Sequence, residues 1–287
     1  MTLEHLIGEE LGRPVPAAAE VLAEAARQRH GSGIAAVLFY GSCLRSGEFT
    51  DKIADLYLLA DSYEAVHQGR CMRLWNRLIP PNVYYLEVEA EGVRLRAKYA
   101  LVTLGQFERL VSRATLNPYF WARFAQPARA VWVRDDRVRR RVTAAVVTAV
   151  RTAWREALPL MPVEADGERG WSLAFGETYR TELRAEGPQR ARELVAAERE
   201  RYLRVAALFG DEADQLSLGR ARRRWRWRRV TGKLLSVLRL VKAAFTFDGG
   251  PDYLAWKIGR HSGVQVELTP WQRRHPLLAA PLLFWRL

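Results

Sequence analysis

Residues 34–42 read IAAVLFYGS, an apolar run that ends in a glycine and a serine. A second apolar run, residues 55–59 with the sequence DLYLL, opens on Asp55. Short apolar runs of this length, bounded by turn residues, are typical of buried strands. We therefore expect two strands of an α/β domain, with the glycine-serine turn and the carboxylate of Asp55 at the same edge of the sheet.

This combination of a turn and a carboxylate outlines a nucleotidyltransferase site. Gly41 has no Cβ, so backbone N–H groups can approach a phosphate there, and the hydroxyl of Ser42 adds one more donor. Asp55 can hold Mg²⁺ against a triphosphate, and the ion can screen the charge that develops as pyrophosphate leaves. Because glycine-serine is also a common loop dipeptide, an ordinary β-hairpin is the competing interpretation.

The composition indicates an anionic partner. The 287 residues are enough for one large or two ordinary domains, and they include 45 Lys and Arg against 32 Asp and Glu. The net charge of +13 predicts binding to a nucleotide, a nucleic acid or an acidic membrane surface, without choosing among them. Cys43 and Cys71 are the only cysteines, which argues against a disulfide framework or a clustered thiolate metal site and favours a reducing cytoplasm.

The sequence contains no stretch of the roughly 18 uninterrupted apolar residues that a membrane-spanning helix needs. The first ten residues carry three glutamates and no basic or long apolar segment, so they do not resemble a signal peptide. The alanine- and arginine-rich composition suggests a bacterial source. We therefore expect a cytoplasmic protein that is peripheral on the inner face of the cell membrane.

Periodicity and turn residues predict an α+β fold in which helices flank a mixed sheet, and the glycine-serine turn beside Asp55 makes this sheet nucleotidyltransferase-like. Helical spacing predicts helices over residues 16–29, 62–78, 104–113, 137–158, 171–185 and 189–208. Alternation and β-forming residues predict strands over residues 34–39, 55–59, 83–89 and 93–102, the last two joined by a turn at Glu91 and Gly92. We expect a nucleotidyltransferase domain over residues 1–136, a small α-rich domain over 137–218 and a tail over 219–287.

The tail is strongly basic, because residues 220–229 are all arginine except for Ala221, Trp225 and Trp227. The apolar residues that follow recur at helical spacing: Leu234, Leu238, Val241 and Phe245. Guanidinium groups pair with lipid phosphates and indoles lie at headgroup depth, so we expect this amphipathic tail to bind an anionic membrane surface. The apolar residues 276–287 can dip into the same interface, or dock on the core. A solvated basic helix and an RNA-binding arm are the competing interpretations of the arginine run.

Several short motifs follow one another in a characteristic order along the chain. They are Tyr40-Gly41-Ser42, Asp55-Leu56-Tyr57, Val83-Tyr84-Tyr85, Lys98-Tyr99, Ala122-Arg123 and Gln126-Pro127, and more weakly Tyr179, Glu182 and Arg184. Together they resemble the mitochondrial translocator-assembly-and-maintenance family of phosphatidate cytidylyltransferases. The resemblance implies Mg²⁺ and the transfer of CMP from CTP to phosphatidic acid, which gives CDP-diacylglycerol and pyrophosphate. It also implies a winged-helix-like second domain and an amphipathic segment that docks on the membrane, and it disfavours nucleic acid as a partner.

The resemblance also suggests roles for individual residues. Those expected around the nucleotide are Tyr40, Gly41, Ser42, Lys98 and Arg123, and those expected in catalysis are Asp55, Lys98 and Ser42. Tyr179 and Arg184 would contact the lipid headgroup. Asp55 would bind the metal, and Glu87 or Glu89 on a neighbouring strand can add a second carboxylate, unless both are surface acids.

Two departures, one from this family and one from nucleotidyltransferases in general, keep other functions open. Cys43 stands where we expect a glycine, which can make the phosphate loop less open, and Asp55 is one acid where common nucleotidyltransferases have two. One alternative is a nucleotidyltransferase that acts on RNA or a small polar molecule. Another is a non-catalytic membrane or nucleic-acid adaptor with the same fold. Without the resemblance, Lys98 is an ordinary lysine on a strand, and Arg123 is a helix arginine paired with a surface acid.

Overall fold

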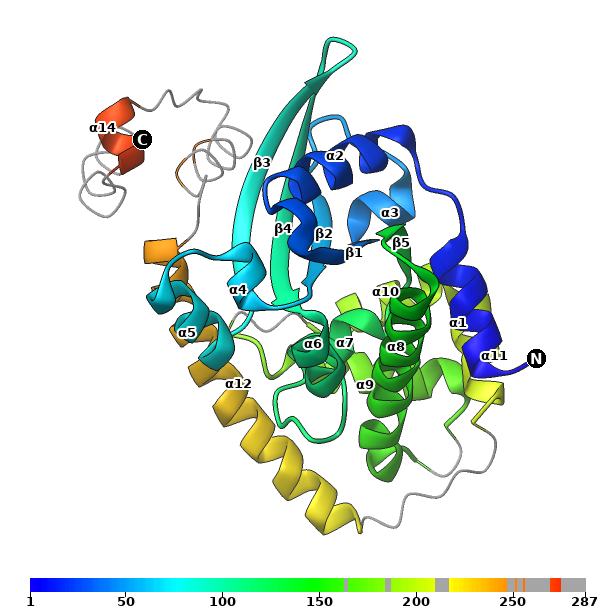
Figure 1. Ribbon diagram of the computed structural model, residues 1–287. Helices are drawn as coiled ribbons and strands as arrows, with labels where there is room; N and C mark the ends of the chain where they lie inside the picture. The colour runs from blue at the N-terminus through cyan, green and yellow to red at the C-terminus, as the bar shows by residue number, and fades with distance from the viewer. Residues whose placement is uncertain are drawn as a thin grey trace. The chain divides into compact units, whose positions relative to one another are not determined.

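The structure, a computed structural model, describes residues 1–162, 165–183, 187–209, 217–246, 251, 255 and 269–274. It contains a mixed five-stranded sheet with flanking helices, which confirms the predicted α+β class (Figure 1). The strand order is β3-β4-β2-β1-β5. The strands are β1 (Ile34–Tyr40), β2 (Ala54–Ala60), β3 (Asn82–Ala90), β4 (Val93–Thr103) and β5 (Ala128–Val133).

By its internal packing the chain divides into two compact units. The first unit consists of residues 1–14 and 103–237, and the second of residues 15–102 and 238–287. These units differ from the predicted domains, whose boundaries lie after residues 136 and 218. The difference arises because α8 (Asp136–Ala157), expected to open a separate domain, packs on α1 (Leu3–Gly12) and α7 (Tyr119–Phe124) from the preceding part of the chain.

The first unit is mostly helical. Its other helices are α6 (Leu104–Leu110), α9 (Gly167–Tyr179), α10 (Pro188–Ala197), α11 (Arg199–Ala207) and residues 218–237 of α12 (Leu218–Thr246). α8 begins after Asp135, whose carboxylate accepts the backbone N–H of Val138 and so satisfies a donor of the first turn. Val142, Val146 and Val150 of α8 are buried, and their four-residue spacing places them on one face of the helix. This apolar face holds α8 in the core of the unit.

The helix predicted over residues 189–208 is in fact two helices, α10 and α11. The chain leaves helical geometry at Glu198, where φ is −131° and ψ is 36°. No glycine or proline occurs between residues 189 and 208, so the sequence carries no local signal for this break. The interruption places Glu198 and the start of α11 beside a cavity within the first unit.

The second unit is built around β1, all seven residues of which are buried. α2 (Ala17–Gln28) packs on β1, and its buried residues include Leu22 and Ala26. β1 pairs antiparallel with β2, and β3 pairs antiparallel with β4. The turn between β3 and β4 is the predicted one, with positive φ angles of 51° at Glu91 and 74° at Gly92.

The connecting helices of the second unit are short. They are the 3₁₀ turn η1 (Gly31–Gly33), α3 (Ser42–Ser46), α4 (Tyr63–Val66) and α5 (Arg70–Leu78). The single helix predicted over residues 62–78 is wrong, because the chain is extended at His67 and Gly69 between α4 and α5. A further short helix, α14 (Pro270–Arg274), lies near the end of the chain.

A polar network lies within the second unit. His30 Nε2 is 3.1 Å from the hydroxyl oxygen of Tyr99, and His67 Nε2 is 2.7 Å from Nδ2 of Asn76. Lys242, near the end of α12, donates to Oδ1 of Asn76 at 2.5 Å. Burial, together with a smaller effect of the neighbouring His67, lowers the pKa of His30 to about 4. Burial also lowers the pKa of His67, so both imidazoles are neutral near pH 7.

We expect the free energy of unfolding to fall as the pH is lowered through the interval between the ordinary histidine pKa of 6.5 and the value of about 4 for His30. Within this interval the unfolded chain protonates His30 and the folded chain does not, so protons favour unfolding. The loss attributable to His30 is about 2 to 3 kcal/mol once the interval is crossed. Lys242 stays charged throughout, because its pKa, lowered by burial, is still about 7.

Urea unfolding at a series of pH values measures this dependence. His30→Gln should flatten it, whereas His5→Gln, which replaces an exposed histidine, should leave it as in the parent. A pH dependence that is the same in His30→Gln and in the parent would contradict the prediction.

Candidate functional site

Asp55 and Gly41 lie together, as expected from the sequence. Asp55 is directly opposite Tyr40 in the register between β1 and β2, and Gly41 follows Tyr40 at the end of β1. A Cβ placed on Gly41 would lie only 2.8 Å from Oδ2 of Asp55. Gly41 has φ 90° and ψ −157°, a conformation that is almost restricted to glycine. The position therefore requires glycine both for its backbone and for the space that the carboxylate occupies.

We expect Gly41→Ala to lower the free energy of unfolding by about 3 kcal/mol, because it combines backbone strain with a clash against Asp55. Gly47 provides a matched control, since its φ is also positive at 70° but a Cβ there meets nothing within 4 Å. Gly47→Ala should cost about 1 kcal/mol. Urea unfolding of both variants tests the difference, and equal losses would show that the contact with Asp55 does not constrain Gly41.

Lys98 completes the polar site from the adjacent strand. Its Nζ lies 3.3 Å from Oδ1 of Asp55, and the side chains of Lys98 and Asp55 are 37% and 21% exposed. β4 lies next to β2 in the sheet, which explains how residues 43 positions apart meet. Tyr99, the next residue, is fully buried and stacks on Tyr84, so alternation along β4 turns Lys98 to the other face. Because both side chains are partly exposed, a ligand can reach the ion pair and replace either of its partners.

Glu87, a candidate metal ligand, has two protein partners. Its Oε1 accepts the hydroxyl of Tyr85 at 2.7 Å and Nε of Arg96 at 3.0 Å. Burial raises the pKa of Tyr85, and Glu87 adds to the effect, so the phenol remains a donor. Tyr85 pairs in register with Lys98, and Glu87 pairs with Arg96, so all four belong to neighbouring rows of β3 and β4. Arg96 was not predicted as a site residue, and Tyr85 was noted only as part of a sequence motif, although strand alternation places both on the face of Glu87 and Lys98.

Within the described residues, no group of three His, Cys, Asp or Glu side chains lies close enough to hold a metal ion. Mg²⁺ at phosphate-transfer sites is commonly held by one or two carboxylates together with substrate phosphates and water. Asp55 is a partly exposed carboxylate beside a glycine that lets the backbone approach, so these residues fit Mg²⁺ as an ion that arrives with a nucleotide.

The residues of the turn itself differ in exposure. Ser42 is exposed and is the first residue of α3, whereas Tyr40 is buried with its ring 6.1 Å from that of Tyr57. Cys43 is buried, and its Sγ donates to the backbone carbonyl of Ile53 at 3.3 Å. Tyr40 and Cys43 are thus part of the core behind the turn, and Gly41 and Ser42 are the residues that a ligand can reach.

The other candidate residues belong to the first unit. Arg123 lies on α7, with its guanidinium 4.9 Å from the ring centre of Tyr119. Tyr179 is the last residue of α9 and is partly buried. Arg184 lies outside the described residues. The predicted roles of these three residues stay predictions.

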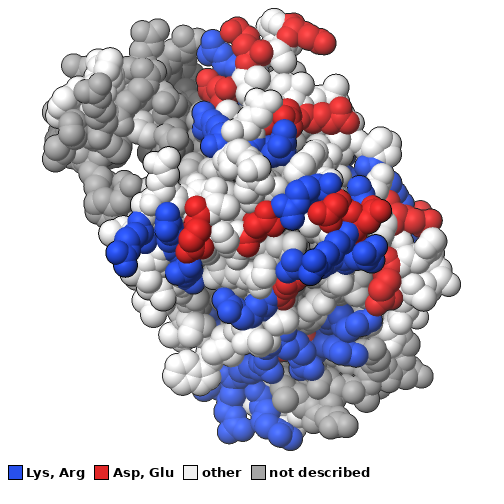
Figure 2. Space-filling view, in the orientation of Figure 1, with Lys and Arg blue, Asp and Glu red and all other residues white. Residues whose placement is uncertain are grey.

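Basic side chains gather over the start of α12, at the lower end of the face in Figure 2. The exposed arginines of this part of the helix are Arg220, Arg222, Arg223 and Arg226. Trp225 and Arg228, by contrast, are buried in the first unit. The expected membrane contact of the arginine run therefore rests on its exposed members, because Trp225 and Arg228 are part of the core.

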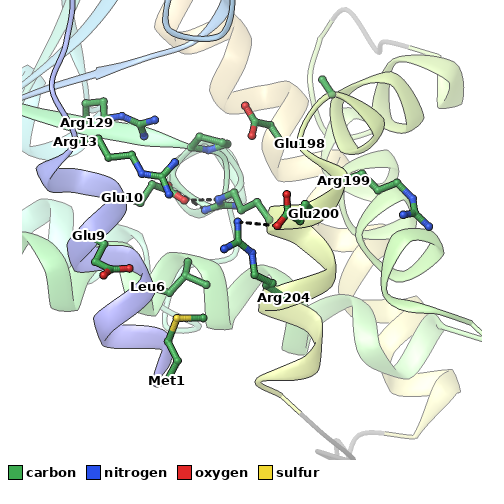
Figure 3. A pocket seen from close by; sticks show the side chains of 13 residues that line it. Met1, Leu6, Glu9, Glu10, Arg13, Arg129, Glu198, Arg199, Glu200 and Arg204 are labelled. Atoms are coloured by element: carbon green, nitrogen blue, oxygen red, sulfur yellow. Dashed lines mark hydrogen bonds and ion pairs between the residues drawn. The ribbon is translucent and has the colours of Figure 1, made fainter.

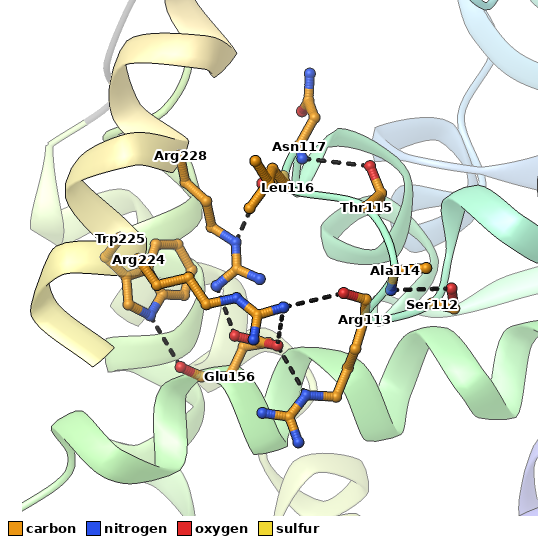
Figure 4. A network of polar contacts seen from close by, with 10 residues as sticks. All are labelled: Ser112, Arg113, Ala114, Thr115, Leu116, Asn117, Glu156, Arg224, Trp225 and Arg228. Carbon is orange, nitrogen blue, oxygen red and sulfur yellow. Dashed lines mark hydrogen bonds and ion pairs between the residues drawn. The ribbon is translucent and has the colours of Figure 1, made fainter. Parts of the chain in front are cut away.

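The buried side of α12 contacts Glu156 of α8 (Figure 4). Oε2 of Glu156 accepts Nη1 of Arg228 at 2.6 Å, and Oε1 accepts Nε of Arg113 at 2.8 Å. Arg224 Nη2 lies 3.2 Å from the same Oε1. Trp225 donates its indole N–H to the backbone carbonyl of Glu156 at 2.9 Å. Burial raises the pKa of the Glu156 carboxyl, but the three guanidinium groups outweigh it and hold this pKa below its usual value.

The opposite side of α12 is apolar and exposed. Within the first unit, Trp227, Val230, Leu234 and Val237 are exposed and recur at intervals of three or four residues. The predicted apolar positions Leu238 and Val241, in the second unit, are exposed as well. The side chain of Phe245 and residues 276–287 lie outside the described residues. In the described part of the chain, no helix is long and apolar enough to cross a membrane.

Comparisons with known proteins assign neither a family nor a function to the chain. No family model matches the chain, and no curated protein matches its sequence.

Proposed function

We propose that the protein is a phosphatidate cytidylyltransferase, which transfers CMP from CTP to phosphatidic acid. The observation that carries the proposal is the contact between Asp55 and Gly41, with Lys98 3.3 Å from the same carboxylate. The order of the sequence motifs supplies the resemblance to this family of enzymes, and with it the choice of CTP and of the lipid acceptor.

The residues of the site have distinct roles in the proposed reaction. Gly41 admits the triphosphate to the backbone, and Ser42 donates its hydroxyl to a phosphate oxygen. Asp55 would hold Mg²⁺, which when bound screens the negative charge of the triphosphate. Lys98, released from Asp55 as the nucleotide binds, donates its ammonium to a phosphate oxygen.

The acceptor needs little activation. A phosphate oxygen of phosphatidic acid forms a bond to the α-phosphorus of CTP, and the bond from that phosphorus to the bridging oxygen of pyrophosphate breaks. Because a phosphate monoester is already anionic near neutral pH, no strong general base is required. Positioning and charge screening account for the catalysis, which suits a site with a single carboxylate.

The exposed face of α12 favours a lipid acceptor. Trp227, Leu234 and their apolar neighbours are flanked by exposed arginines, the combination that partitions into an anionic bilayer surface. The same exposed arginines also suit the phosphates of RNA, which keeps a nucleotidyltransferase with an RNA acceptor as the second candidate.

The decisive assay incubates the full chain with cytidine-labelled CTP, Mg²⁺ and vesicles of phosphatidic acid in phosphatidylcholine. The expected result is a labelled lipid that requires phosphatidic acid and disappears when the metal is chelated. A parallel incubation replaces the vesicles with RNA. Labelled RNA without labelled lipid would favour the second candidate, and no labelled product in either incubation would favour a non-catalytic adaptor.

A further inference from the structure

A cavity of about 310 Å³ lies within the first unit, beside α1, the start of β5 and the junction of α10 and α11 (Figure 3). Nine of its lining residues are charged, five arginines and four glutamates. The arrangement of their charges decides what the cavity can bind.

Four of these nine charged residues pair with one another. The carboxylate of Glu10 is buried and accepts Nε of Arg201 at 2.5 Å and Nη2 at 3.2 Å. Arg201 also donates to the backbone carbonyl of Ala125 at 3.0 Å, which fixes the pair in the wall of the cavity. At the rim, Arg204 Nη2 lies 3.7 Å from Oε1 of Glu200.

Two other lining residues pair with residues that do not line the cavity. Arg199 donates Nε to Glu168 at 2.6 Å, and its side chain points away from the cavity in Figure 3. Glu9 lies 3.2 Å from Nε2 of His5. The remaining charged groups are the guanidinium groups of Arg13 and Arg129 and the carboxylate of Glu198.

Arg13 and Arg129 reach toward the same part of the cavity (Figure 3). Neither forms an ion pair within the described part of the chain. Arg129 is partly buried and donates Nη1 to the backbone carbonyl of Ala128 at 3.0 Å. The pKa of Arg129 is lowered, mainly by burial. The negative charges of Glu10 and Glu198 oppose this shift, and the positive charges of Arg13 and Arg201 add to it. In the part of the chain that the structure describes, the bond to Ala128 is the one hydrogen bond of these two guanidinium groups, so two like charges meet here with most of their donors open to a ligand.

We propose that this cavity binds a small oxyanion of the phosphate class, held by Arg13 and Arg129. A guanidinium group presents parallel N–H donors that match two oxygens of a phosphate. An anion between the two arginines reduces their repulsion and accepts hydrogen bonds from both. Glu198 and Glu9 offset part of this positive charge, since His5, the partner of Glu9, is charged only when protonated. Binding therefore depends on the direct donors of the two arginines. The inference does not depend on the proposed cytidylyltransferase activity.

Calorimetric titration with inorganic phosphate tests this site, at an ionic strength held constant with sodium chloride. Arg129→Gln and Arg13→Gln should each weaken binding about tenfold or more, because each removes a charged donor. Arg140→Gln is the matched control, since Arg140 is an exposed arginine of the same unit with no ion pair among the described residues. It should bind phosphate as the parent does.

Backbone hydrogen exchange locates the bound ion. Phosphate should slow exchange in residues 10–13, 128–130 and 198–201 of the parent but not of Arg13→Gln, which alters an exposed position and should fold. Failure of phosphate to bind, or binding of equal affinity in Arg13→Gln and the parent, would overturn the proposal. Slowed exchange confined to residues around Gly41 would do the same, because it would assign the phosphate to the candidate catalytic site.

Discussion

Asp55→Asn should form CDP-diacylglycerol about a thousandfold more slowly than the parent, while remaining folded. The substitution keeps the size of the side chain and one acceptor oxygen but removes the charge that would hold Mg²⁺. It also removes the negative charge that lies 3.3 Å from Nζ of Lys98. Because both side chains of that pair are partly exposed, losing their ion pair should change the free energy of unfolding by less than about 1 kcal/mol. We therefore expect Asp55→Asn to lose most of its activity with little change in the free energy of unfolding.

The measurement is the initial rate of labelled lipid formation at saturating CTP, with urea unfolding of the same preparations. Glu20→Gln is the control for loss of one negative charge, since Glu20 is exposed on α2 in the same unit. It should retain the parental rate. An Asp55→Asn protein that matches the parent in rate would remove the metal role from Asp55, and with it the central support for the proposed mechanism.

The candidate catalytic site was predictable because its residues belong to strongly patterned local segments. The apolar runs that became β1 and β2 are short and bounded by turn residues, and their antiparallel pairing brings Gly41 to Asp55. The turn at Glu91 and Gly92 fixed the register of β3 and β4 in the same way. Strand alternation then placed Lys98 and Tyr99 on opposite faces.

The missed features depend on contacts between residues far apart in the sequence. Glu156 is 72 residues from Arg228, and Glu10 is 191 residues from Arg201. A glutamate or arginine within an amphipathic helix has no sequence mark that distinguishes a buried ion pair from a solvated one. The break at Glu198 was missed for a related reason, since no glycine or proline accompanies it. Tertiary packing determines whether such residues form buried ion pairs and where such a helix breaks.

The largest loss of stability is expected from Glu156→Gln. The side chain of Glu156 is 1% exposed, and it faces the guanidinium groups of Arg113, Arg224 and Arg228, the last of which is fully buried. Removing its charge leaves the fully buried guanidinium group of Arg228 without the carboxylate that accepts its Nη1. Breaking a buried ion pair on one side typically costs about 3 to 5 kcal/mol, because the remaining charge is neither solvated nor paired. We expect a loss within that range.

Urea unfolding of the full chain measures this loss, and Glu193→Gln provides the control. Glu193 lies 3.5 Å from Arg190 in an exposed pair of the same unit, so the same substitution there should cost less than about 1 kcal/mol. Trp225 donates to the backbone of Glu156, and its indole therefore reports whether α12 stays docked. If Glu156→Gln unfolds at the same urea concentration as Glu193→Gln, the arginines do not depend on Glu156 for neutralisation. A loss in the expected range would establish that the arginine-rich segment has two functions, with one side of α12 holding the core and the other left exposed.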